Sequence, residues 1–85
     1  MTNIIIMKTI SFTTKDFKQT EKGFVFTSTC EDAENKKYAV EGLQPDGSYQ
    51  EVQVVMTSKG DRIEITEEQP FNGRIIYEEA NIKNK

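Results

Sequence analysis

Apolar residues recur at every second position along most of the chain. Such alternation places successive side chains on opposite faces of a pleated strand. The runs are filled by β-branched and aromatic residues, which suit a half-buried sheet. The pattern therefore predicts six strands, at residues 4–13, 23–30, 36–43, 49–57, 62–66 and 73–79.

The apolar positions that share one face of these strands form the predicted core. They are Ile6, Ile10, Phe12, Phe24, Phe26, Tyr38, Val40, Val52, Val54, Met56, Ile63, Ile65, Ile75 and Tyr77. Lys8 interrupts the apolar face of the first run.

Residues typical of turns separate the runs. The segment "QPDGS" (44–48) predicts a hairpin turn at Asp46-Gly47, with a positive φ at Gly47. A second tight turn is expected at 58–61 and a polar loop at 31–37. The segment from Thr14 to Thr20 is predicted to hold one helical turn, capped by Thr14 and with Phe17 directed inward.

These elements predict one all-β domain that covers residues 1–85. Short loops make strands that are adjacent in sequence the expected antiparallel neighbours. The predicted architecture is a small antiparallel β-sandwich or a partly open barrel of about six strands, with at most one short helix.

The stretch "EEQPFNGRIIYEE" (67–79) permits two interpretations. Asn72-Gly73 is typical of a two-residue hairpin turn. That register would place Pro70, which has no N–H, inside a ladder, and Glu67 opposite Glu78. The preferred interpretation is a longer loop, with Gly73 at the start or in a bulge of the last strand and Phe71 at one end of the core.

The tail "GDRIEITEEQPFNGRIIYEE" (60–79) resembles the C-terminal edge of small β-sandwich domains in bacteriophage virion proteins. The residues that carry the resemblance are Ile63, Ile65, Pro70, Phe71, Gly73, Ile75 and Ile76. The resemblance covers about 20 residues and is a packing pattern. It implies a capsid-decorating, head-fibre or tail-associated protein.

The composition excludes several kinds of functional site. The chain has no histidine and one cysteine, Cys30, so an internal disulfide and a Cys/His zinc site are excluded. Eleven basic and 14 acidic residues give a net charge of −3, which argues against a nucleic-acid-binding face. No apolar run is long enough for a membrane span, and "NIIIM" is too short for a signal peptide. We expect a protein of the virion or the host cytoplasm.

No candidate for catalysis or metal binding survives comparison with a structural role. Cys30 has no basic partner and lies next to acidic residues, which raise the pKa of a thiol. The acidic segment 31–35 lacks the spacing and the glycine of a calcium loop. The adjacent pairs Glu67/Glu68 and Glu78/Glu79 point to opposite faces of a strand and cannot act together. Stacking of bases on the aromatic residues is opposed by the negative charge. We expect no cofactor, no metal and no enzymatic activity.

Three classes of function remain. The first is a structural or interaction module that assembles with copies of itself or with other protein chains, as in a virion. The second is a small acidic inhibitor or anti-defence protein that binds a basic surface. The third is a carrier of a small ligand, although side chains fill the interior of so small a barrel.

The apolar run "NIIIM" carries large side chains on both faces of the first strand. One face meets the domain's own core, and the other needs a cover from another chain. The expected partner contacts are Ile4, Ile5, Met7, Phe71 and Arg74, with strand addition as the simplest geometry.

Overall fold

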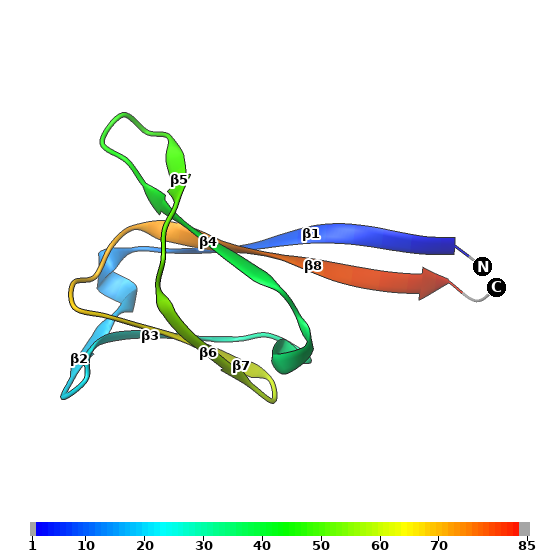
Figure 1. The fold of residues 1–85 in the computed structure, drawn as a ribbon, viewed down its shortest axis with the longest axis horizontal. Coiled ribbons are helices and arrows are strands. Elements are labelled where there is room, and N and C mark those ends of the chain that lie inside the picture. The colour runs from blue at the N-terminus through cyan, green and yellow to red at the C-terminus, as the bar shows by residue number, and fades with distance from the viewer. Residues whose placement is uncertain (1, 84–85) are drawn as a thin grey trace.

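The computed structural model describes the backbone of residues 2–83 and the side chains of residues 6–79. Eight strands and two single-turn 3₁₀ helices make up this part of the chain (Figure 1). The strands are β1 (Thr2–Phe12), β2 (Lys18–Thr20), β3 (Gly23–Thr29), β4 (Tyr38–Leu43), β5 (Tyr49–Glu51), β6 (Val55–Lys59), β7 (Arg62–Glu67) and β8 (Gly73–Lys83). The 3₁₀ helices are η1 (Thr14–Asp16) and η2 (Ala33–Asn35). Across residues 2–83, no helix is long and apolar enough to cross a membrane.

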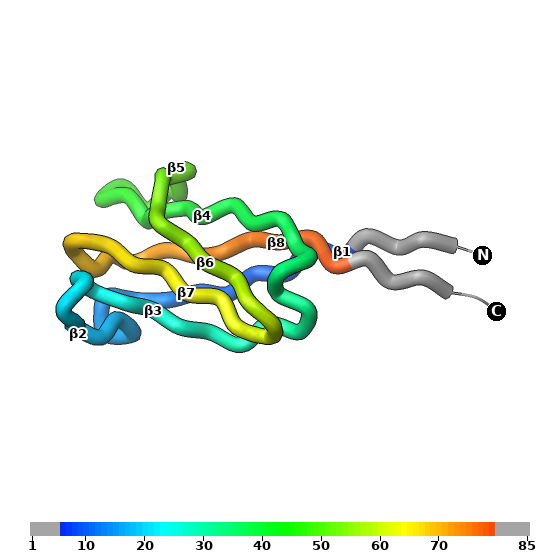
Figure 2. The backbone as a smooth tube through the Cα atoms, turned by 60° about the horizontal axis from the view of Figure 1, so that its bottom comes forward, coloured from blue at the N-terminus to red at the C-terminus, as the bar shows by residue number. Residues whose placement is uncertain are grey.

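The strands form two four-stranded antiparallel sheets that pack together. One sheet has the order β1-β8-β4-β5, and the other has the order β2-β3-β7-β6. The two layers are visible in Figure 2, and they do not close into a barrel. The prediction of an all-β sandwich is confirmed, and the barrel alternative is not supported.

The expectation that sequence neighbours pair with one another holds only in part. The pairs β2–β3, β4–β5 and β6–β7 are consecutive in sequence. The pairs β1–β8, β8–β4 and β3–β7 join strands that are distant in sequence. Four connections of the chain pass from one sheet to the other, so the next strand in sequence often lies in the opposite layer.

The predicted strand 49–57 is wrong as a single element. It divides into β5 and β6, because the chain crosses between the two sheets at residues 52–54. Val52 still donates a backbone hydrogen bond to the carbonyl oxygen of Val40 (2.9 Å). Val52, Val54 and Met56 all pack against the core, so every second side chain still points inward where the chain passes from one sheet to the other.

The segment between β1 and β3 contains the predicted helical turn and one strand that was not predicted. The N-cap of η1 is Thr13 and not the predicted Thr14: the Thr13 N–H donates to the Asp16 carboxylate (2.8 Å). Phe17 is buried, as predicted. The missed strand β2 consists only of exposed polar residues, so no apolar period marks it. The last strand also continues to Lys83, beyond its predicted end at Glu79.

The core prediction is confirmed for 13 of its 14 residues, which are buried or pack against the buried cluster. Ile6 is the exception: it is partly exposed and lies outside the cluster. The structure adds Cys30 and Ala33 to the buried set and includes Phe17, which was predicted to point inward. Ile63, Ile65 and Ile75 are the largest side chains that are fully buried.

The turns and the loop predicted in the second half of the chain are confirmed, including the tight turn at Gly60 and Asp61 between β6 and β7. Gly47 has φ 90° in the loop between β4 and β5, where its N–H donates to the carbonyl oxygen of Gln44 (2.9 Å). Residues 68–72 form the longer loop before β8, and Gly73 opens that strand. A Cβ at Gly73 would collide with the carbonyl oxygen of Glu41 and press on the rings of Phe12 and Phe71, so a side chain is excluded there.

Candidate interaction surface

Strands β1 and β8 continue past the end of the sandwich as a two-stranded ribbon, which we call the arm. Their pairing runs from Thr2 opposite Lys83 to Phe12 opposite Gly73. Strand β4 pairs with β8 only as far as Tyr77. The arm therefore consists of residues 2–7 and 78–83, and it projects beyond all other elements in Figure 1.

The arm has two open edges within the described part of the chain. Strand β1 is the outermost strand of its sheet, so its outer edge has no paired strand along its length. Strand β8 has β1 on one side and, beyond Tyr77, no strand on the other. Open edges of this length are templates for pairing with another chain.

A shallow groove of about 330 Å³ lies at the root of the arm. Residues opposite each other in an antiparallel pair share a face, so the register places Met7 beside Glu78 and Ile76 beside Ala39 on the outer face of the sheet. The groove is lined by Met7, Lys37, Tyr38, Ala39, Ile76, Tyr77 and Glu78. Its floor is therefore apolar, and charged residues stand at its rim.

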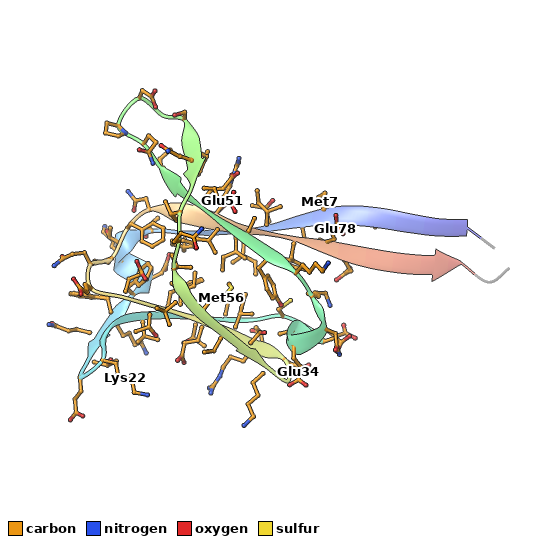
Figure 3. All side chains as sticks on the ribbon, in the orientation of Figure 1. Met7, Lys22, Glu34, Glu51, Met56 and Glu78 are labelled. Carbon is orange, nitrogen blue, oxygen red and sulfur yellow. The ribbon has the colours of Figure 1, made fainter. Side chains whose placement is uncertain are left out.

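The rim of the groove carries one charge of each sign. Lys37 and Glu78 are both exposed. The one ion pair among residues 6–79 joins Arg74 and Glu41, so neither rim residue is neutralised by a salt bridge within this part of the chain. Met7 is 57% exposed and lies beside Glu78, on the side of β8 that is opposite to Lys37 (Figure 3).

The structure brings the predicted partner contacts to different places. Met7 lies at the root of the arm. Ile4 and Ile5 are in β1 within the arm, but their side chains lie outside those that the structure describes. Phe71 packs at the opposite end of the sandwich, with its ring centroid 5.1 Å from that of Phe12. Arg74 is held on the outer face of the sheet.

The surroundings of Arg74 account for its position without a partner. Its Nε donates to the Glu41 carboxylate (2.7 Å), and its guanidinium carbon lies 3.8 Å from the centre of the Tyr49 ring. A guanidinium over an aromatic face is attracted by the ring quadrupole. These contacts tie β8, β4 and β5 together across the sheet.

A second hollow, of about 200 Å³, lies at the far end of the sandwich. It is lined by Gly42, Leu43, Gln44, Val52, Glu67, Phe71 and Asn72. Pockets that bind drug-sized ligands usually measure about 300–1,000 Å³. Several polar groups here already serve the fold: the Asn72 side chain accepts the N–H of Thr14 (2.9 Å), and Glu67 accepts that of Val55 (3.4 Å).

The thiol of Cys30 is buried among hydroxyl groups. The Tyr38 hydroxyl donates to the carbonyl oxygen of Ala33 (2.7 Å) and approaches the Cys30 sulfur at 3.7 Å. The pKa values of Tyr38 and Tyr77 are raised above the usual 10, mainly because both side chains are partly buried and, to a smaller extent, because they contact Cys30. The two tyrosine side chains therefore stay uncharged near neutral pH, and they pack with Cys30 against the core.

The acidic segment 31–35 forms hydrogen bonds with the turn between β6 and β7. Glu34 accepts the N–H of Gly60 (2.7 Å), and Asp61 accepts the N–H of Asp32 (3.2 Å). Asp32 adopts a left-handed backbone conformation, with φ 55°. Over residues 6–79, no group of three or more acidic, histidine or cysteine side chains is arranged to hold a metal ion.

Comparison with known proteins gives no relative. No protein-family model, no curated protein sequence and no solved structure matches this chain.

Sequence reasoning identified Met7 but not the other residues around the groove. Ile76 and Ala39 occupy the polar-facing positions of their runs, and Lys37 belongs to a segment expected to be a polar loop. Only the register of β1, β8 and β4 brings these residues together. The sequence did contain one signal: Ile76 and Met7 are both apolar residues at positions of their strands that do not face the predicted core.

Proposed function

We propose that this chain is a non-enzymatic interaction module, which joins other protein chains through the arm. The observation that carries this proposal is the continuation of β1 and β8 past the last residue pair with β4. An isolated two-stranded ribbon is only marginally stable in water. A neighbouring chain that pairs with an edge or covers a face of the arm would supply the missing contacts.

The exposed apolar surface supports the same proposal. Met7 projects at the base of the arm, over a groove whose floor is apolar. Burying an apolar side chain contributes about 25 cal/mol per Å². Burial of Met7 and of the exposed parts of Ile76 and Ala39 would contribute a few kcal/mol to association.

We further propose that the assembly in question is a bacteriophage virion. Support comes from the resemblance of residues 60–79 to β-sandwich domains of virion proteins, together with the all-β sandwich fold. Fold analogy by itself carries little functional weight, so the identity of the partner is the decisive observation.

The acidic-inhibitor alternative has less support from the geometry. A charge mimic needs its acidic groups on one face. Here Glu34 and Asp61 accept hydrogen bonds from the protein's own backbone near the β6–β7 turn, while Glu67 lies by the second hollow and Glu78 at the root of the arm.

Site-specific photo-crosslinking tests the proposal. A benzophenone side chain replaces Met7 in one variant and Val55 in a control. Val55 is 65% exposed on the other sheet, so both replacements are made at exposed apolar positions. In the cells that naturally make the protein, we expect protein adducts from position 7 and none from position 55.

The identity of the adduct separates the alternatives. Virion proteins, or further copies of this chain recovered from particles, support the virion proposal, whereas a host enzyme as the main adduct supports the inhibitor. Equal labelling from positions 7 and 55, or no adduct from position 7, contradicts the role of the arm.

A further inference from the structure

The groove at the root of the arm has a property that restricts what can occupy it. In a two-fold symmetric contact, the same patch meets itself, and every residue contacts the partner's copy of another residue. A patch with a single sign of charge repels its own copy. This patch carries Lys37 and Glu78 on its rim, so a copy rotated by the two-fold axis can place each charge against its opposite.

The apolar part of the patch is also self-complementary. Each copy presents one protruding side chain, Met7, and one shallow apolar floor formed by Ala39 and Ile76. Met is flexible and fills irregular apolar spaces well. A protrusion and a recess on the same surface are what a two-fold contact requires.

We propose that the occupant of this groove is a second copy of the chain. In the resulting dimer, Met7 of each copy enters the groove of the other, and Lys37 of each copy pairs with Glu78 of the other. This inference rests on the proposed interaction function and assigns its first partner. The groove lies on a face of the sheet, so the dimer leaves the edges of the arm open for larger assembly.

Charge reversal gives a sharp test, because the symmetry makes a distinctive pattern. Lys37→Glu places like charges together at both rim contacts of the dimer, and Glu78→Lys does the same with the opposite sign. The double variant Lys37→Glu/Glu78→Lys restores both pairs. In an equimolar mixture of the two single variants, one copy carries two acidic rim groups and the other carries two basic ones. The two copies then attract each other at both rim contacts, so the mixture forms a heterodimer.

Sedimentation velocity over low-micromolar to millimolar concentrations measures these equilibria. We expect dimerisation of the unmodified chain, roughly tenfold weaker self-association of each single variant because two attractions become two repulsions, and recovery in the double variant and in the mixture. Lys22→Glu and Glu68→Lys are matched controls: both residues are exposed, both lie outside the groove, and the changes in net charge are the same.

The outcomes distinguish this inference from the proposed function. A chain that stays monomeric at every concentration, while position 7 crosslinks to a different protein, overturns the dimer and leaves the interaction module standing. A dimer whose affinity responds equally to the rim variants and their controls, or a mixture that does not associate, overturns the assigned contact. Circular dichroism of each variant shows whether the sandwich is still folded.

Discussion

Strand β8 passes through two different environments within a few residues. Between Gly73 and Tyr77 it has β1 on one side, β4 on the other and a second sheet over one face, and there Ile75 is fully buried. From Glu78 onward it keeps only β1 as a neighbour. The stability of each part of a strand therefore depends on how many neighbouring strands and covering layers it has, and one strand can belong to the core at one end and to an exposed ribbon at the other.

Hydrogen exchange of the backbone amides is expected to show the largest difference between these regions. Amides of Ile63 and Ile65, in the middle of a covered sheet, are expected to exchange only on global unfolding, which typically costs about 5–15 kcal/mol. Amides of Met7, Glu78 and Glu79 are expected to exchange through local opening of the arm at far lower cost. NMR-detected exchange in dilute monomeric protein measures both sets. Equal protection in the two sets would contradict the distinction between sandwich and arm.

Truncation of side chains gives the next largest effect. Ile75→Ala removes a fully buried side chain and is expected to destabilise the fold by about 2–5 kcal/mol, whereas Met7→Ala is expected to change the stability of the monomer by less than about 0.5 kcal/mol. Urea denaturation followed by circular dichroism measures both variants. A loss of more than about 1 kcal/mol in dilute Met7→Ala would place Met7 in the core instead of on a free surface.

The exposed turn between β4 and β5 provides the smallest effect. Gly47 has a positive φ, and a Cβ at this position would meet no other atom within 4 Å. The expected loss of about 1 kcal/mol in Gly47→Val therefore comes from the backbone alone.

The neighbouring residue is the control for this turn. Ser48 donates both its hydroxyl and its N–H to the Asp46 carboxylate, which lowers the pKa of that group. Ser48→Ala removes only the hydroxyl bond on an exposed loop, so thermal unfolding should show a smaller loss than in Gly47→Val. A larger loss in Ser48→Ala would mean that the Asp46 hydrogen bonds, and not the backbone conformation, stabilise the turn.

The residues around the groove show why the candidate interaction surface was harder to predict than the core. Ile63, Ile65 and Ile75 alternate with polar residues, and each run indicates by itself which face is buried. Ala39, Ile76 and Met7 come from three strands and become neighbours only because β8 pairs with both β1 and β4. That pairing joins the two ends of the chain to its middle, and no local pattern specifies it.

The sequence by itself determined the all-β class, the position of the β4–β5 turn, the loop before β8 and nearly all of the core, because each depends on local alternation or on the backbone preferences of Gly and Pro. Tertiary structure alone decided that residues 49–57 divide between two sheets, that the polar segment 18–20 is a strand, and that the last strand extends to Lys83. In each case the deciding contacts join residues far apart in the chain. A strand forms where a partner strand satisfies its backbone hydrogen bonds, and the identity of that partner is a property of the whole fold.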